Sequence, residues 1–168
     1  METAYYLDKF QKIADELDPK HFSEKKLECK VGIWMDCAVL KVQKRSWINK
    51  SQMARPFEES IFFSVWVSAE SIRTGKLYYN IHALKLRQLT GYKIKSRDFA
   101  TSFRMRFKDF QKKWPNVHLD LGPLTLMEGW VVLHEEHFAA IVKDLAYNFS
   151  AIAFTIDELL EERKKSGI

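Results

Sequence analysis

Apolar and polar side chains alternate along several stretches of the chain, and this period of two is typical of β-strands. The alternation runs through residues 27–42, where a change of parity after Val39 indicates either a bulge or a turn near residues 35–36. Residues 61–68 and 76–84 alternate in the same way, and the connection between them is too short for a parallel crossover. We therefore predict an antiparallel pair there. Two further strands are predicted later in the chain, a short one over residues 117–121 and a last one over residues 129–133.

Three other stretches change to helical spacing. Apolar residues recur at every third or fourth position from Thr3, a suitable N-cap, to Asp18, from Ser96 onward, and over residues 137–163. The last helix is long enough to cross a whole sheet. The predicted order is α-β-β-β-β-α-(β)-β-α. It describes one α+β domain over residues 1–168, with a mainly antiparallel sheet of about five strands covered by N-terminal, middle and long C-terminal helices.

The composition supports one aromatic-rich core in a soluble, cytoplasmic protein. The chain is 46% apolar and 14% aromatic, enough to fold without a disulfide or a structural metal. We interpret Cys29 and Cys37, which both lie in an apolar stretch, as reduced core residues. The amino terminus is charged and amphipathic rather than a signal peptide, and no apolar run approaches eighteen residues. We therefore expect no membrane contact.

Charge is distributed unevenly along the chain, which has a net charge of +5. Residues 61–114 hold twelve Lys or Arg against three Asp or Glu, whereas residues 115–168 hold four against nine. Such segregation is typical of a positive face that attracts anions, but it also arises where a basic helix packs against an acidic one. The sequence leaves both interpretations open.

The basic charge is concentrated in KIKSRDFATSFRMRFKDFQKKW, residues 93–114, with eight Lys or Arg and five aromatic rings. On a helical wheel the rings form one stripe, which predicts that they belong to the core rather than to a base-stacking surface. Four cations form the opposite stripe, and two more precede the helix, where its dipole favours anions. Ordinary solvation, or pairing with Asp157, Glu158, Glu161 and Glu162 in the C-terminal helix, explains the same pattern. The candidate anion-binding residues are Lys93, Lys95, Arg97, Arg104, Lys108 and Lys112.

Three histidine-containing groups are candidates for other chemistry. His134-Glu135-Glu136-His137 could hold a metal or transfer protons, although it is not a HExxH motif and its spacing implies no third ligand. His82 shares one strand face with Tyr78, next to Trp66, and these three could line a pocket between the sheet and the C-terminal helix. A half-solvated sheet face explains that row equally well. His118 and Asp120 share one side of a short strand, without a nucleophile nearby in the sequence.

No glycine-rich phosphate loop or nucleophile elbow is present, so we expect no nucleotide cofactor, no other cofactor and no metal. The sequence therefore favours a non-catalytic binding or accessory protein with an electropositive helix that contacts an anionic partner, either nucleic acid or an acidic protein. A small-ligand-binding domain is the second hypothesis. A metal-dependent enzyme that uses residues 134–137 is the third.

Overall fold

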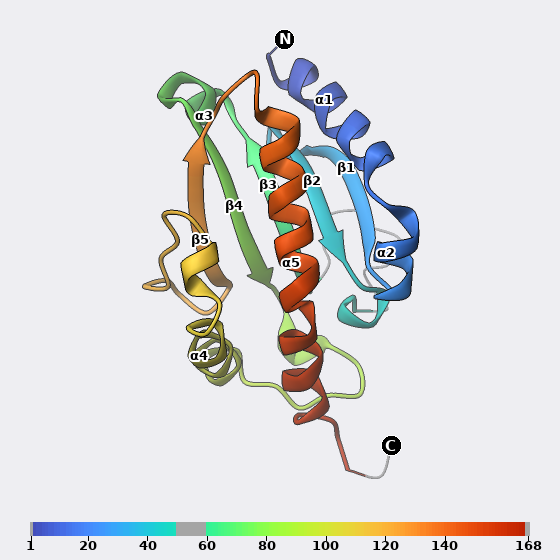
Figure 1. The fold of residues 1–168 in the computed structure, drawn as a ribbon. Coiled ribbons are helices and arrows are strands. Elements are labelled where there is room, and N and C mark those ends of the chain that lie inside the picture. The colour runs from blue at the N-terminus through green and yellow to red at the C-terminus, as the bar shows by residue number, and fades with distance from the viewer. Residues whose placement is uncertain (1, 50–59, 167–168) are drawn as a thin grey trace.

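One antiparallel sheet organises the molecule (Figure 1). The structure is a computed structural model that describes residues 2–49 and 60–166. The sheet has five strands in the order β1-β2-β3-β4-β5, so each strand pairs with its neighbours in sequence. The bounds are β1 Glu28–Trp34, β2 Cys37–Gln43, β3 Ile61–Val67, β4 Lys76–Ala83 and β5 Thr125–Val132. The predicted α+β class, strand number and order of elements are confirmed.

A tight turn explains the change of parity that the sequence shows in this region. Met35 and Asp36 have φ values of 50° and 63° and join β1 directly to β2. Two consecutive positive φ angles match the right-handed twist of a hairpin. Trp34 then pairs with Cys37 and Val31 with Leu40, which places the apolar residues of both strands on the same side.

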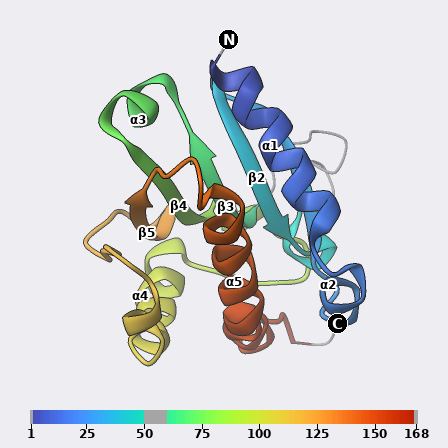
Figure 2. The same ribbon diagram turned by 45° about the horizontal axis from the view of Figure 1, so that its top comes forward.

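Three helices cover one face of the sheet (Figures 1 and 2). They are α1 Glu2–Glu16, α4 Ser96–Phe107 and α5 Phe138–Glu161. The core lies between these helices and the sheet, where Phe63 of β3 stacks on Phe149 of α5 with ring centroids 4.7 Å apart. The long C-terminal helix thus crosses the sheet as predicted.

Several short helices were not predicted. Asp18 does not simply end α1, because its carboxylate accepts hydrogen bonds from the backbone N–H groups of Lys20 and His21 and caps a second helix. Ser68 caps another in the connection between β3 and β4, which ends at Gly75 in the left-handed conformation. The short elements are α2 Pro19–Glu24, α3 Ala69–Thr74 and the 3₁₀ turns η1 Arg45–Trp47, η3 Leu86–Gln88 and η4 Gln111–Lys113.

The basic helix is shorter than the sequence indicates. Ser96 is its first residue rather than its N-cap, and the N-cap Lys95 makes no side-chain capping bond. The helix ends at Phe107, and the chain turns so that Trp114 packs on Phe63 and Tyr79 in the core. The helical wheel therefore describes the positions of the side chains only as far as Phe107.

The short strand predicted over residues 117–121 is reduced to a single bridge. His118 exchanges backbone hydrogen bonds with Glu128 at 2.8 and 3.2 Å, beside the edge strand β5. No other residue of that stretch forms a ladder within the described ranges.

Helix α5 is long enough and apolar enough on average to cross a membrane, by length and composition alone. However, 50% of its most apolar stretch is buried inside the protein, and a helix in the core of a globular domain has the same length and composition. Phe149 and Ile156 of this helix are fully buried in the core beneath the sheet. The burial accounts for the apolar composition without a membrane.

Candidate anion-binding site

A cavity of about 810 Å³ opens at the amino-terminal end of α4. We call it the basic hollow and define it by its lining. The lining consists of Arg87, Tyr92, Lys93, Ile94, Lys95, Ser96, Arg97, Pro123 and Lys165.

Backbone pairing brings distant parts of the chain to this hollow. The N–H of Lys93 donates to the carbonyl of Arg163 at 2.9 Å, and the N–H of Lys165 donates to Gly91 at 3.0 Å. Buried Ile94 anchors the connection between them in the core. The segment after α5 is thereby fixed beside the start of α4, and Lys165 becomes part of the lining.

The charged side chains that line the hollow are all cations. Its five cations are exposed, and none makes a side-chain hydrogen bond or ion pair with any residue in the described ranges. No carboxylate belongs to the lining among those residues. Ser96 and Arg97, the first residues of the 12-residue helix α4, line the same cavity, where the helix dipole favours negative charge.

The nearest acidic residue on α4 is neutralised. Asp98 pairs with Arg163 at 2.9 Å, and the side chain of Arg163 is only 13% exposed. The guanidinium of Arg163 also lies 5.6 Å from the centroid of the Phe99 ring and donates a hydrogen bond to the Leu159 carbonyl. Because Asp98 is paired in this way, its negative charge offsets little of the positive charge of the five cations in the hollow.

The predicted cationic stripe is divided by the structure. Arg97 lines the basic hollow, and Lys108 and Lys112 are exposed at the other end of the helix. Arg104 instead donates to the backbone carbonyls of Gly122, Thr125 and Leu126 at 2.9–3.0 Å. Burial lowers the pKa of Arg104 below its ordinary value. It fixes a loop and is not a free anion ligand, contrary to our expectation for the stripe.

The acidic C-terminal helix does not cover the stripe. Glu158 and Glu162 pair with Arg106, which the stripe did not include. Asp157 accepts hydrogen bonds from Lys44 and from the indole of Trp47. Glu161, the remaining acid of the four named from the sequence, pairs with Lys164 at 2.9 Å.

The aromatic prediction for this segment is confirmed by burial. The rings of Phe99, Phe103, Phe107 and Trp114 are between 0% and 3% exposed, and the ring of Phe110 is half-buried against Phe154. These rings hold α4 on the sheet and on α5. They offer no stacking surface to a nucleic acid.

The pocket predicted between the sheet and the C-terminal helix is not formed by the residues that we named. Trp66, Tyr78 and His82 lie on the sheet face opposite α5, because their neighbours Val65, Tyr79 and Ile81 form the helix-covered core. Trp66 and Tyr78 stack on each other with centroids 4.7 Å apart. Burial lowers the pKa of His82 to about 4, and its ring lies 5.6 Å from that of Trp34.

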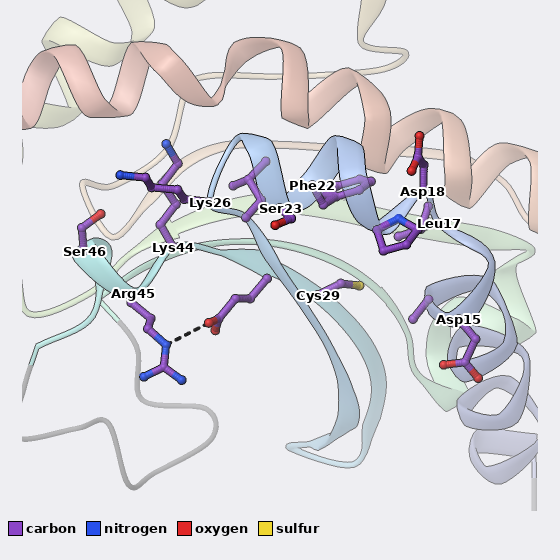
Figure 3. A pocket seen from close by; sticks show the side chains of 14 residues that line it. Asp15, Leu17, Asp18, Phe22, Ser23, Lys26, Cys29, Lys44, Arg45 and Ser46 are labelled. Carbon is purple, nitrogen blue, oxygen red and sulfur yellow. Dashed lines mark hydrogen bonds and ion pairs between the residues drawn. The ribbon is translucent and has the colours of Figure 1, made fainter.

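A second cavity, of about 770 Å³, lies between α1, α2, the start of β1 and the start of η1 (Figure 3). In this α2 pocket Lys26, Lys44 and Arg45 lie toward one end of the view and Asp15 toward the other, with Cys29 between them. Burial raises the pKa of the Cys29 thiol to about 12. The residues that define the pocket are Ala14, Asp15, Leu17, Asp18, Pro19, Phe22, Ser23, Lys26, Leu27, Glu28, Cys29, Lys44, Arg45 and Ser46.

Two of the three cations that line the α2 pocket have carboxylate partners. Arg45 donates to Glu28 at 2.9 Å, and Lys44 donates to Asp157. Asp18, also in the lining, is occupied as the cap of α2. The pocket combines an apolar floor with nearly balanced charge, so it is suited to a small organic ligand rather than to a polyanion.

The histidine cluster before α5 does not assemble a metal site within the part of the chain that the structure describes. The rings of His134 and His137 lie next to each other, with centroids 5.1 Å apart and ring planes tilted by 48°. Glu135 points elsewhere, because its carboxylate accepts from Tyr5 at 2.9 Å and from Lys9 at 2.7 Å. These bonds tie α1 to the start of α5.

The predicted pair of His118 and Asp120 does not form. His118 faces Glu128 instead, with Nε2 and Oε2 4.0 Å apart. Asp120 is exposed and interacts electrostatically with Arg104.

One serine–histidine contact escaped the sequence interpretation. Nε2 of His21 lies 2.9 Å from Oγ of Ser150, which is 3% exposed. The hydroxyl of Ser150 donates its proton to the Tyr147 carbonyl at 2.6 Å, so the histidine serves as donor rather than base. The contact fixes α2 on α5 and activates no nucleophile.

Arg87 and Lys165 are the cations of the hollow that sequence reasoning missed. No local pattern singles them out, because backbone pairing around Tyr92 brings them to the site from different parts of the chain. Compared with known proteins, the chain matches no family model, no curated protein and no solved structure. The residues themselves therefore carry the functional argument.

Proposed function

We propose that this protein is a non-catalytic binding or accessory domain that holds an anionic partner, nucleic acid or an acidic protein, in the basic hollow. The observation that carries the proposal is the convergence of five exposed cations without a lining carboxylate among the described residues. Three of them, Lys93, Lys95 and Arg97, belong to the set that the sequence predicts.

Physical chemistry supports an anionic occupant. Five like charges around one cavity repel each other, and an anion relieves this repulsion while it also meets the positive end of the α4 dipole. Exposed contacts are individually worth about 1 kcal/mol or less. Affinity must then come from several simultaneous contacts and must fall as salt rises.

Charge reversal tests the proposal. In the variant Lys93→Glu/Arg97→Glu, we expect the affinity for fluorescein-labelled oligothymidylate of twenty nucleotides, measured by fluorescence anisotropy at 50 mM salt, to fall at least tenfold. A labelled polyglutamate peptide measured in the same way distinguishes nucleic acid from acidic protein. The tighter of the two probes identifies the class of partner.

The matched control is Lys20→Glu/Lys25→Glu, which changes net charge equally at two exposed lysines outside the hollow. We expect this variant to lose less than threefold. Equal losses in the two variants would show that net charge alone drives binding and would contradict the proposal. Urea unfolding of both variants confirms that the fold is retained.

The α2 pocket favours a second candidate function, binding of a small organic ligand. Its volume of about 770 Å³ lies within the range of ligand sites, and buried Leu17, Phe22 and Leu27 supply an apolar floor. A thermal-shift screen tests it, since a ligand at a hundred times its dissociation constant stabilises a protein by about 2.7 kcal/mol. A ligand that acts equally on a Leu27→Lys variant binds elsewhere.

We also propose a cytoplasmic location. Both cysteines are free thiols, and Cys29 is largely enclosed, which is compatible with a reducing compartment. Labelling of thiols in fractionated cells tests this. Recovery of the protein in an oxidising compartment would contradict it.

A further inference from the structure

A second cavity lined by cations lies at the other end of α4. It has a volume of about 580 Å³, and its lining again contains no carboxylate among the residues that the structure describes. We call it the distal hollow. It is lined by Lys108, Gln111, Lys112, Trp114, Pro115, Asn116 and Val117.

The distal hollow is held in place by the sheet. The hydroxyl of Tyr79 donates to the Pro115 carbonyl at 2.6 Å, and its ring lies against Gly129, where a Cβ would stand 2.3 Å from the Tyr79 oxygen. Asn116 donates to the Trp130 carbonyl at 3.1 Å. These bonds fix the turn after η4 on the edge of β5.

Helix α4 connects the two hollows. It has 12 residues, so its ends lie about 18 Å apart at 1.5 Å per residue. Arg104, between them, fixes the loop at residues 122–126, and Pro123 of that loop also lines the basic hollow. Lys108, the first cation of the distal hollow, follows the last helical residue directly.

Few negative charges interrupt this path. Asp98 is paired with Arg163, and Asp120 interacts electrostatically with the half-buried Arg104. Asp109 is exposed on the turn that follows α4. Along the path, Arg97, Lys108 and Lys112 make no ion pair with a residue in the described ranges.

We propose that a single strand of nucleic acid, with its bases stacked on one another, lies along α4 with phosphates in both hollows. This inference rests on the proposed function and names its partner. A stacked strand rises roughly 3.4 Å per nucleotide, so about five nucleotides cover the distance between the hollows. A flexible strand can bend into two separate cavities, which a rigid duplex or a folded acidic surface cannot do.

Length dependence and charge reversal together test the inference. The probes are labelled oligothymidylates of three and twelve nucleotides, a twelve-base-pair duplex and a polyglutamate peptide. We expect the twelve-nucleotide strand to bind at least tenfold more tightly than the three-nucleotide strand, the duplex or the peptide. Lys108→Glu/Lys112→Glu should weaken the longer strand at least fivefold and change the shorter one less than twofold.

The matched control is Lys25→Glu/Lys113→Glu, because Lys113 is exposed beside the distal hollow but does not line it. We expect this control to lose less than twofold with every probe. If the distal variant behaves like the control, the path along α4 is wrong while the proposed function stands. If Lys93→Glu/Arg97→Glu also leaves binding unchanged, the proposed function itself fails. Equal or tighter binding of the duplex or the peptide would overturn the choice of single strand.

Discussion

The basic hollow and the α2 pocket have nearly equal volumes, about 810 and 770 Å³, but they differ in the charges of their lining residues. In the α2 pocket Arg45 and Lys44 have carboxylate partners, and the cavity has an apolar floor. The cations of the basic hollow have no such partners within the described ranges. Cavity size therefore does not decide what a site can hold. The position of the carboxylates decides it, because a paired cation has already lost most of its attraction for an external anion.

The difference extends to stability. In the α2 pocket the charged groups connect η1 to α5 through Asp157 and so help to hold the fold. The free cations of the basic hollow contribute repulsion instead, which the fold must tolerate. Binding sites and stabilising contacts are thus built from the same residue types at the two places.

The largest contrast is expected for thiol reactivity, because burial raises the pKa of Cys29 to about 12 in the α2 pocket. Only the thiolate reacts with a disulfide reagent, so in the Cys37→Ser variant at pH 8 we expect Cys29 to react about a thousandfold more slowly than a free cysteine. Reaction kinetics with a chromogenic disulfide measure this. The urea-unfolded variant supplies the reference rate. A native rate within tenfold of that reference would show that solvent reaches the Cys29 thiol and that burial does not suppress its ionisation.

The next effect concerns the free energy of unfolding. Asp157→Ala removes the partner of Lys44 and of the Trp47 indole, and we expect a loss of about 2–3 kcal/mol in urea denaturation. Lys93→Glu/Arg97→Glu in the basic hollow should stay within about 0.5 kcal/mol of the unmodified protein. Similar losses in both variants would abolish the distinction between the two sites.

A smaller effect is expected when the α2 pocket is given unbalanced charge. Asp15→Asn/Glu28→Gln leaves its cations with less negative charge nearby. On the Lys93→Glu/Arg97→Glu background, we expect this change to restore oligothymidylate affinity about tenfold, measured by anisotropy. Asp8→Asn/Glu24→Gln, two exposed acids outside the pocket, is the matched control. A gain of the same size in the control would mean that only net charge matters.

The smallest effect is expected at the edge of the basic hollow. Asp98→Asn removes one of the two carboxylates that pair with Arg163, the other being Glu162, and we expect oligothymidylate to bind two- to threefold more tightly. Anisotropy titrations at 50 and 200 mM salt should show a larger gain at the lower salt, because screening weakens exposed charge interactions. Weaker binding in this variant would indicate that the Asp98–Arg163 pair positions the hollow rather than limiting its charge.

Local periodicity was sufficient for most of the fold. The alternation over residues 27–42 and 61–84 predicts four paired strands correctly, because a half-buried antiparallel strand imposes its period on the sequence. The end of α4 could not be predicted in this way. The helical wheel continues to Trp114, but packing of that ring on Phe63 and Tyr79 requires the chain to turn after Phe107.

The candidate site was predictable only where its residues are close in sequence. Lys93, Lys95 and Arg97 lie within one short stretch, and the position before a helix indicates their role. Arg87 and Lys165 reach the same hollow through the path of the backbone. Trp66, Tyr78 and His82 were predicted to face the C-terminal helix, but they lie on the opposite face of the sheet. Alternation shows that residues share a face, but it does not show which face the helices cover.

Spacing along the chain is enough to specify the strands, the long helices, the aromatic core and the segregation of basic from acidic segments. Tertiary structure alone decided which cations remain free. Arg104 is bound by carbonyls of a distant loop, and Arg106 and Arg163 find carboxylates on another helix. These partners are set by how α4 packs on β5 and α5, which no local spacing encodes. Within KIKSRDFATSFRMRFKDFQKKW the side chains at its two ends therefore carry the function that we propose.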